Sequence, residues 1–136
     1  MSQRMKPAQK KHRMRRGRLT SIFDRLNDRY FEGELPPVYV KQDFRYDSGV
    51  EGWLDPKALT IHLSKRLVGA DVERVILHEM IHLKTGGDHD DAFWSELHRL
   101  AKVGAPMAQV ELTDFKAELN ELRRRRRRLH ARRSPA

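Results

Sequence analysis

VILHEMIH, the stretch at residues 75–82, sets two histidines and a glutamate into an otherwise apolar run. His78 and His82 are four residues apart, so on an α-helix they project from one face, one turn apart. Polar side chains at such half-buried positions are costly unless they have partners. A zinc ion is a suitable partner, because two imidazoles fill two of its four tetrahedral positions. The alternative is an ordinary pair of core or surface histidines.

Glu79 completes the pattern H-E-x-x-H, which is typical of zinc metalloprotease helices. Its place is beside the face that carries His78 and His82, where its carboxylate can reach a water molecule. Zinc lowers the pKa of such a water to about 7, and a neighbouring carboxylate can accept the proton. The pattern therefore predicts a helix with two metal ligands and a general base.

A third ligand is needed, because two histidines alone hold zinc weakly. The candidates downstream are His89, Glu96 and His98. We expect His89 at the start of the next helix, after a turn long enough to reverse the chain. Glu96 shares that helix face, whereas His98 falls on the opposite side and is excluded. The spacing leaves open a three-histidine site with His89 and a two-histidine, one-glutamate site with Glu96.

The composition narrows the class of protein. With 136 residues, 38% of them hydrophobic, the chain is expected to form one domain, and no apolar run approaches the roughly 20 residues of a membrane span. Its basic start is not followed by the apolar segment of a secretory signal. The absence of cysteine excludes disulfides and a cysteine zinc ribbon. We expect a cytoplasmic monomer, nuclear in a eukaryotic host, with no membrane partner.

Positive charge is concentrated at the two ends of the chain. Residues 1–18 carry eight Lys/Arg and no acid, and residues 123–133 carry eight Arg, whereas 19–122 holds 12 Lys/Arg and all 19 acids. We expect 1–18 and 123–136 to be solvated arms that bind DNA or RNA phosphates in a salt-dependent manner. The alternatives are a role in solubility, or folding back onto the acidic domain. The candidate nucleic-acid-binding residues are Arg123, Arg124, Arg125, Arg126, Arg127 and Arg128.

Apolar periodicity and turn residues predict the remaining elements. Ser21 and Asp24 have the spacing of a capping box at a helix start, and the arginine block is expected to fray because its charges repel one another. His62 alternates with apolar neighbours and is expected to face solvent. We expect helices over 21–32, 70–84, 88–104 and 113–122, and strands over 38–46, 50–54 and 58–63.

Together these elements predict an α+β fold of a minimal zincin-like kind over residues 19–122. A small, mostly antiparallel three-stranded sheet would pack on the N-terminal helix and on the helix with His78, because so small a sheet needs a helix on one face. One or two further helices would follow.

The segment HEMIHLKTGGDHDDAFWSEL, residues 78–97, resembles the active-site segment of SprT-like zinc metalloproteases. This group includes Spartan and is related to the WLM and YgjP-like proteins. Residues 22–40 and 52–64 are similar to its first helix, first strand and hairpin, so the resemblance covers about 20–103. It implies one zinc ion on His78, His82 and His89, with Glu79 as catalytic base and an aromatic residue at Phe93.

Two features depart from the family pattern. The C-terminal cysteine zinc ribbon of many members is absent, and Asp90 stands where many have glycine. These differences concern substrate recognition and the level of activity more than the metal ligands.

The resemblance implies a zinc-dependent endopeptidase acting on proteins bound or crosslinked to DNA, with the peptide added as a strand to a sheet edge. One alternative is a zinc-dependent endoribonuclease of the YbeY kind, although Glu79 favours peptide hydrolysis and the gap from His82 to His89 is one residue too long. Others are a non-catalytic, zinc-containing nucleic-acid-binding module and a basic packaging or ribosome-associated protein with a fortuitous motif.

Overall fold

A computed structural model describes residues 17–45 and 49–133 of the chain. None of the helices in these residues combines the length and the apolar character of a membrane span. The elements, in chain order, are α2 (Gly17–Tyr30), β1 (Tyr39–Phe44), β2 (Gly52–Asp55), β3 (Thr60–Ser64), α3 (Ala70–Thr85), α4 (Asp91–Lys102) and α5 (Ala108–Arg133).

The three strands form one mixed sheet in the order β1-β3-β2. β2 and β3 pair antiparallel, whereas β1 pairs with β3 in parallel. The predicted α+β class and three-stranded sheet are confirmed, with the correction that the sheet is mixed rather than mostly antiparallel. The reason is that β3 takes the centre: four of its five residues are buried, while β1 and β2 keep the exposed positions that suit sheet edges.

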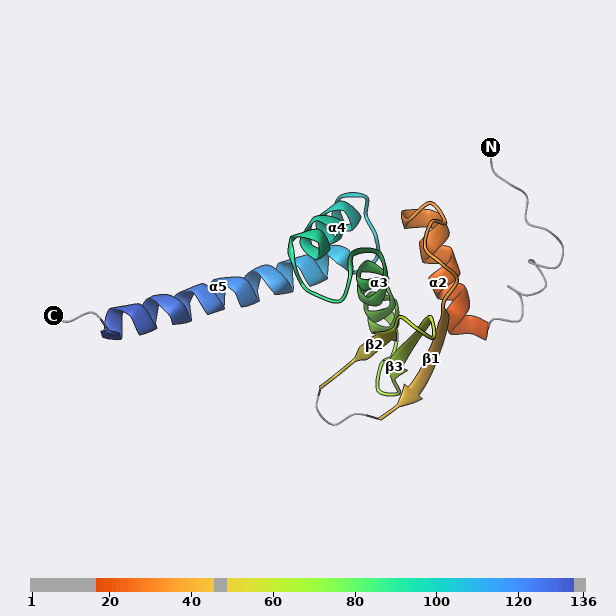
Figure 1. The fold of residues 1–136 in the computed structure, drawn as a ribbon, viewed down its shortest axis with the longest axis horizontal. Coiled ribbons are helices and arrows are strands. Elements are labelled where there is room, and N and C mark those ends of the chain that lie inside the picture. The colour runs from red at the N-terminus through yellow and green to blue at the C-terminus, as the bar shows by residue number, and fades with distance from the viewer. Residues whose placement is uncertain (1–16, 46–48, 134–136) are drawn as a thin grey trace.

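Helices α2 and α3 cover one face of this sheet (Figure 1). The core between them is apolar, with Phe23 and Ile76 from the helices and Ile61 from β3 all fully buried. Gly52 lets β2 approach α3 closely, because a Cβ at this position would lie 2.6 Å from Val75 Cγ1. One side of α3 therefore packs on the sheet, and the side with the histidines faces α4 and α5.

The start of α2 differs from the prediction. The helix begins at Gly17, so Ser21 lies inside it and its hydroxyl donates to Gly17 O at 2.8 Å instead of forming a capping box. Thr20 is buried, and its hydroxyl accepts a hydrogen bond from Val40 N at 3.0 Å, which attaches β1 to α2. The predicted arm over 1–18 is helical at its last two residues, and 1–16 lie outside the described residues.

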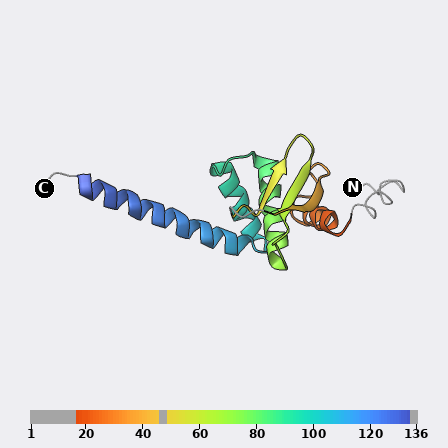
Figure 2. The ribbon, with the colours of Figure 1, turned by 90° about the horizontal axis from the view of Figure 1, so that it is seen from below.

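The later helices also differ in their ends. Helix α4 starts at Asp91 rather than at residue 88, because Asp90 caps it: the Asp90 side chain accepts the N–H of Phe93 at 3.1 Å. Helix α5 starts at Ala108 and continues through the arginine block, so the predicted fraying from residue 123 is wrong up to residue 133. Arginine is a good helix former, and Glu121 pairs with three of the arginines. Figures 1 and 2 show α5 extending far from the body.

Candidate metal centre

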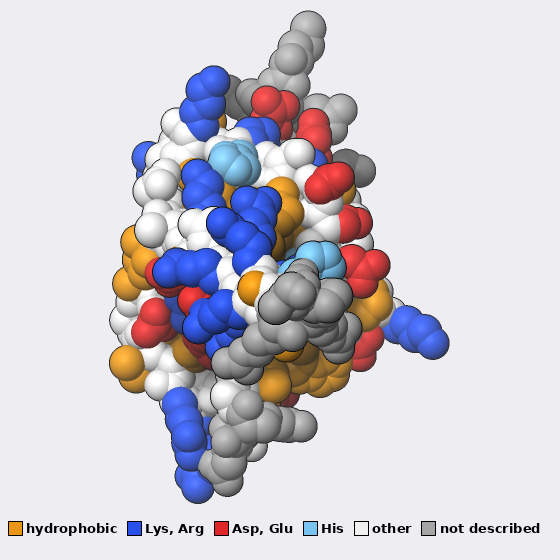
Figure 3. Space-filling view, turned by 90° about the vertical axis from the view of Figure 1, so that its left-hand side faces the viewer, with side chains coloured by type: hydrophobic (Ala, Val, Ile, Leu, Met, Phe, Trp, Pro, Cys, Tyr) orange, Lys and Arg blue, Asp and Glu red, His pale blue; other side chains and the backbone are white. Residues whose placement is uncertain are grey.

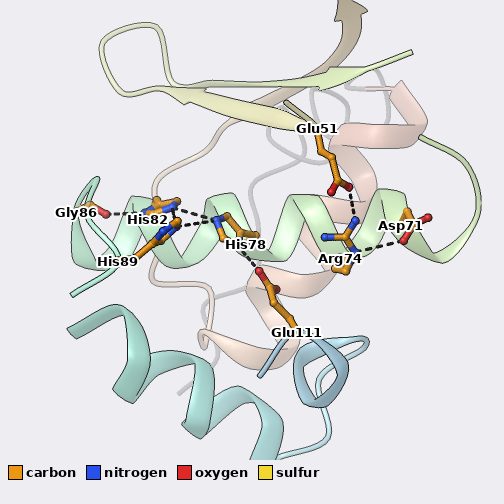
Figure 4. A network of polar contacts seen from close by, with 8 residues as sticks. All are labelled: Glu51, Asp71, Arg74, His78, His82, Gly86, His89 and Glu111. Atoms are coloured by element: carbon orange, nitrogen blue, oxygen red, sulfur yellow. Dashed lines mark hydrogen bonds and ion pairs between the residues drawn. The ribbon is translucent and has the colours of Figure 1, made fainter. Parts of the chain in front are cut away.

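Three histidines converge at the C-terminal end of α3 (Figure 4). His78 and His82 lie on α3, and His89 lies in the loop before α4. The Nε2 atom of His82 lies 3.1 Å from that of His78 and 3.0 Å from that of His89. The Nε2 atoms of His78 and His89 are 3.2 Å apart. Within the described part of the chain, this is the group of histidines and acids that could hold a metal ion.

The triangle of nitrogens fits a tetrahedral zinc ion. Bonds of 2.0–2.1 Å at tetrahedral angles place neighbouring ligand nitrogens about 3.3 Å apart, close to the observed separations. His78 and His82 both use Nδ1 for other partners, so each carries its proton there and turns a lone pair toward the triangle. Lone pairs that converge in this way repel one another unless a cation lies between them. The donor set therefore suits a metal ion.

Outer contacts fix the orientation of two of the rings. The Nδ1–H of His78 donates to the Glu111 carboxylate from α5, and that of His82 donates to Gly86 O at 2.9 Å. Gly86 ends α3 with φ of 111°, a conformation that favours glycine, and its N–H returns to His82 O at 2.8 Å. Contacts of this kind set the tautomer and direction of a metal-binding imidazole.

The electrostatics of the site follow from burial and from Glu111. Burial lowers the pKa of His78, but the hydrogen bond and charge of Glu111 outweigh it and leave that pKa raised. Burial lowers the pKa of His82 and that of His89, and the charge of His78 adds to both shifts. Both rings therefore stay neutral, as a metal ligand must, at pH values where an ordinary histidine begins to protonate.

Glu79 lies on α3 next to His78 and is 7% exposed. Burial raises the pKa of its carboxyl; the charge of His78 opposes the shift and that of Glu111 adds to it. Among the described residues, no donor makes a hydrogen bond to this carboxylate. It is therefore available to a water molecule, and its raised pKa makes it a stronger base than an ordinary glutamate.

The alternative ligand Glu96 has a different role. Its buried carboxylate accepts hydrogen bonds from Lys84 Nζ at 2.9 Å and Arg99 Nε at 2.8 Å. Burial raises its pKa, but these two cations outweigh burial and lower it. Glu96 thus ties α4 to α3 as an ion pair, and the structure brings His89 rather than Glu96 to the histidines of α3.

The other histidines singled out in the sequence lie elsewhere. His98, as expected, points away from the site and lies beside Trp94, with ring centroids 6.0 Å apart. His62 faces away from the core, as predicted, but it is not simply solvated. It stacks on Trp53 at 4.2 Å, and its Nδ1 lies 2.8 Å from an Asp43 oxygen.

Sequence reasoning missed Glu111, which is 33 residues after His78 on another helix. No spacing rule links the two positions, so no local signal could have identified it. Phe93 was expected from the family pattern, and its buried ring lies within 5.0 Å of all three imidazole centroids. It forms an apolar wall that limits how the rings can turn.

A model described as the SprT-like family matches residues 19–116, which is most of the chain. The chain belongs to the SprT-like family. The predicted resemblance is therefore confirmed, and the SprT-like match includes the three histidines, Glu79 and Glu111 but ends before the arginine block. The SprT-like family is of the metallopeptidase type and is associated with zinc. No curated protein and no solved structure matches this chain.

If His89 is the third ligand, His89→Ala should weaken zinc binding by more than about 100-fold, beyond the usual cost of losing an outer partner. Competition with a chromophoric zinc chelator measures the affinity. His98→Ala is the matched control, because His98 lies on α4 away from the triangle, and it should bind zinc like the parent. Equal affinity of both variants would contradict the assignment.

The contact between Glu111 and His78 predicts a second effect. Glu111→Ala should weaken zinc binding about 10- to 100-fold, because the His78 ring loses the acceptor that orients it. Glu118→Ala removes the same charge from the same helix without touching Nδ1, and it should change the affinity much less. Similar losses in the two variants would mean that net charge, not the hydrogen bond, is responsible.

Proposed function

We propose that this chain is a zinc-dependent endopeptidase with one zinc ion held by His78, His82 and His89. The observation that carries the proposal is the triangle of Nε2 atoms on the helix that also carries Glu79. The carboxylate of Glu79 accepts no hydrogen bond from the described residues, so a water molecule can bind it. The group contains three protein donors. Catalytic zinc sites use three donors and keep a position open, whereas structural sites are closed by four.

In this mechanism the zinc ion, when bound, polarises the scissile carbonyl and makes a neighbouring water more acidic. Glu79 accepts the proton of that water as it attacks the carbonyl carbon, and it then passes the proton to the leaving amine. Glu111 and Gly86 keep the rings of His78 and His82 in their ligand tautomer. Membership of the SprT-like family supports peptide hydrolysis over RNA hydrolysis at this site.

We infer that the peptide binds as an added strand on β2, an edge of the sheet. This strand packs against α3 where Gly52 meets Val75, one turn before His78. A peptide along it would therefore run beside the helix that carries the site.

We further propose that the substrates are proteins bound or crosslinked to DNA, with the basic segments as tethers. A tether raises the local concentration of enzyme without a specific site. Support comes from Arg123–Arg128, which α5 presents to solvent outside the body. The arginines lie beyond the family match, so the tether is argued from the sequence of this chain and not from the match.

The role of Glu79 is tested by Glu79→Gln, which keeps the shape of the side chain and removes its basicity. It should retain zinc and lose proteolysis of a DNA-bound protein by about 100-fold or more, the contribution of a general base. Glu118→Gln is the control for loss of one negative charge near the site and should cleave normally. Unchanged cleavage by Glu79→Gln would exclude Glu79 as the base.

The tether is tested by removing residues 123–136. DNA affinity should fall, and its logarithm should depend less steeply on salt concentration, because fewer phosphates are neutralised. The measurement is fluorescence anisotropy of labelled DNA over a series of salt concentrations. The rest of α5 keeps its packing on α4, so zinc content should not change. Equal salt slopes with and without the segment would exclude the tether.

A further inference from the structure

A groove of about 370 Å³ lies between α4 and α5, away from the triangle of histidines. Its volume is within the range of about 300–1,000 Å³ that is usual for small-molecule sites. The lining combines an indole, an imidazole and two cations with no acid. The residues are Trp94, His98, Lys116, Leu119, Asn120 and Arg123.

The two sides of α5 differ in charge. Lys116, Asn120, Arg123 and Arg127 are spaced three and four residues apart and share the helix face that borders the groove. The acids Asp114, Glu118 and Glu121 fall about 160° around the helix at 100° per residue, on the opposite face. Figure 3 shows Lys and Arg side chains gathered around the outer end of α5.

Ion pairing sharpens this difference. Glu121 lies within 3.8 Å of Arg124, 3.5 Å of Arg125 and 3.2 Å of Arg128, so these three arginines are partly neutralised. Lys116 and Arg123 make no ion pair with any acid that the structure describes. The groove therefore carries two cations that are available to an external anion.

Trp94 supplies a fixed aromatic surface in the groove. Its ring meets that of Phe115 edge to face, with centroids 3.8 Å apart, and lies 6.0 Å from the His98 ring. It is half-buried and packs against the core. A ring held in this way loses little freedom when a base stacks on it, and base–aromatic stacking with flanking cations is how proteins hold single strands.

We propose that the groove between α4 and α5 binds one nucleotide of single-stranded nucleic acid. The base stacks on Trp94, the adjoining phosphates contact Lys116 and Arg123, and the strand continues along α5 toward Arg127. A duplex fits less well, because its bases are already stacked and cannot reach the indole.

The groove lies near the candidate metal centre, so a bound strand can bring a substrate to it. This role rests on the proposed function. Phe115 lies between the two sites, since its ring is 3.8 Å from Trp94 and 6.3 Å from His89. A strand in the groove would pass close to the metal centre. A protein attached to that strand would then be presented to Glu79.

The chain offers a direct probe, because Trp53 and Trp94 are its two tryptophans. In a Trp53→Phe background, oligothymidylate should quench Trp94 fluorescence, and duplex DNA of the same length should quench it much less. Oligoglutamate, a polyanion without bases, should cause no quenching. Unchanged Trp94 fluorescence on binding of oligothymidylate would overturn the proposal, as would equal quenching by the duplex.

Charge variants give a second measure that leaves the core untouched. Lys116→Gln with Arg123→Gln should flatten the salt slope for oligothymidylate by about 1.4, the value for two phosphate contacts on a single strand. Arg125→Gln with Arg128→Gln removes the same charge from two arginines that pair with Glu121 and point away from the groove, and it should change the slope much less. Equal effects of the two pairs would overturn the proposal.

Trp94→Leu should weaken binding about 5- to 100-fold by loss of stacking. Circular dichroism checks that this variant folds. If it does not fold, the salt slopes of the two double charge variants test the proposal. All binding is measured on zinc-loaded Glu79→Gln protein, so it does not depend on proteolysis. If the groove does not bind nucleotides, the parent protein should still cleave a free unfolded protein. If the protein is not a peptidase, that cleavage should be absent, and nucleotide binding should be unchanged.

Discussion

The convergence of three imidazole nitrogens within 3.2 Å of one another is the constraint on which the rest of the structure depends. Lone pairs that face one another at this distance repel, and a shared cation would remove the repulsion. Holding them there requires α3 for two rings, a glycine at its end to return the chain, and α5 for the carboxylate behind His78. The sheet and α2 contribute by fixing the opposite side of α3.

Acidic and basic side chains lie on different sides of α5 around this site. Two carboxylates lie beside His78: Glu79 is buried and Glu111 is half-buried. Burial raises the pKa of Glu79, and the charge of Glu111 adds to this shift. Lys116 and Arg123, which make no ion pair with a described acid, lie on another side of α5, at the groove. Helix α5 thus lies between the candidate metal centre with its acids and the groove with its cations, and the Phe115 ring contacts both Trp94 and His89.

Features that depend on short spacings within one element could be predicted from the sequence. The pair His78 and His82, with the ends of their helix, follows from periodicity within one element. The choice between His89 and Glu96 needed the ion pair of Glu96 with Lys84, which joins two helices. The parallel pairing of β1 and the contact of Glu111 join residues far apart in the chain, and no periodicity reports them. The arginine helix was missed because repulsion was considered without the offsetting pairs of Glu121.

Helix α5 carries two features on one continuous element, the carboxylate that contacts His78 and the arginine block. Its 26 residues, roughly 39 Å long, run unbroken from the carboxylate behind His78 to the arginines at its tip. Because Glu111 and the arginines belong to one continuous helix, a tilt of the outer part of α5 would also move the carboxylate that orients the His78 ring.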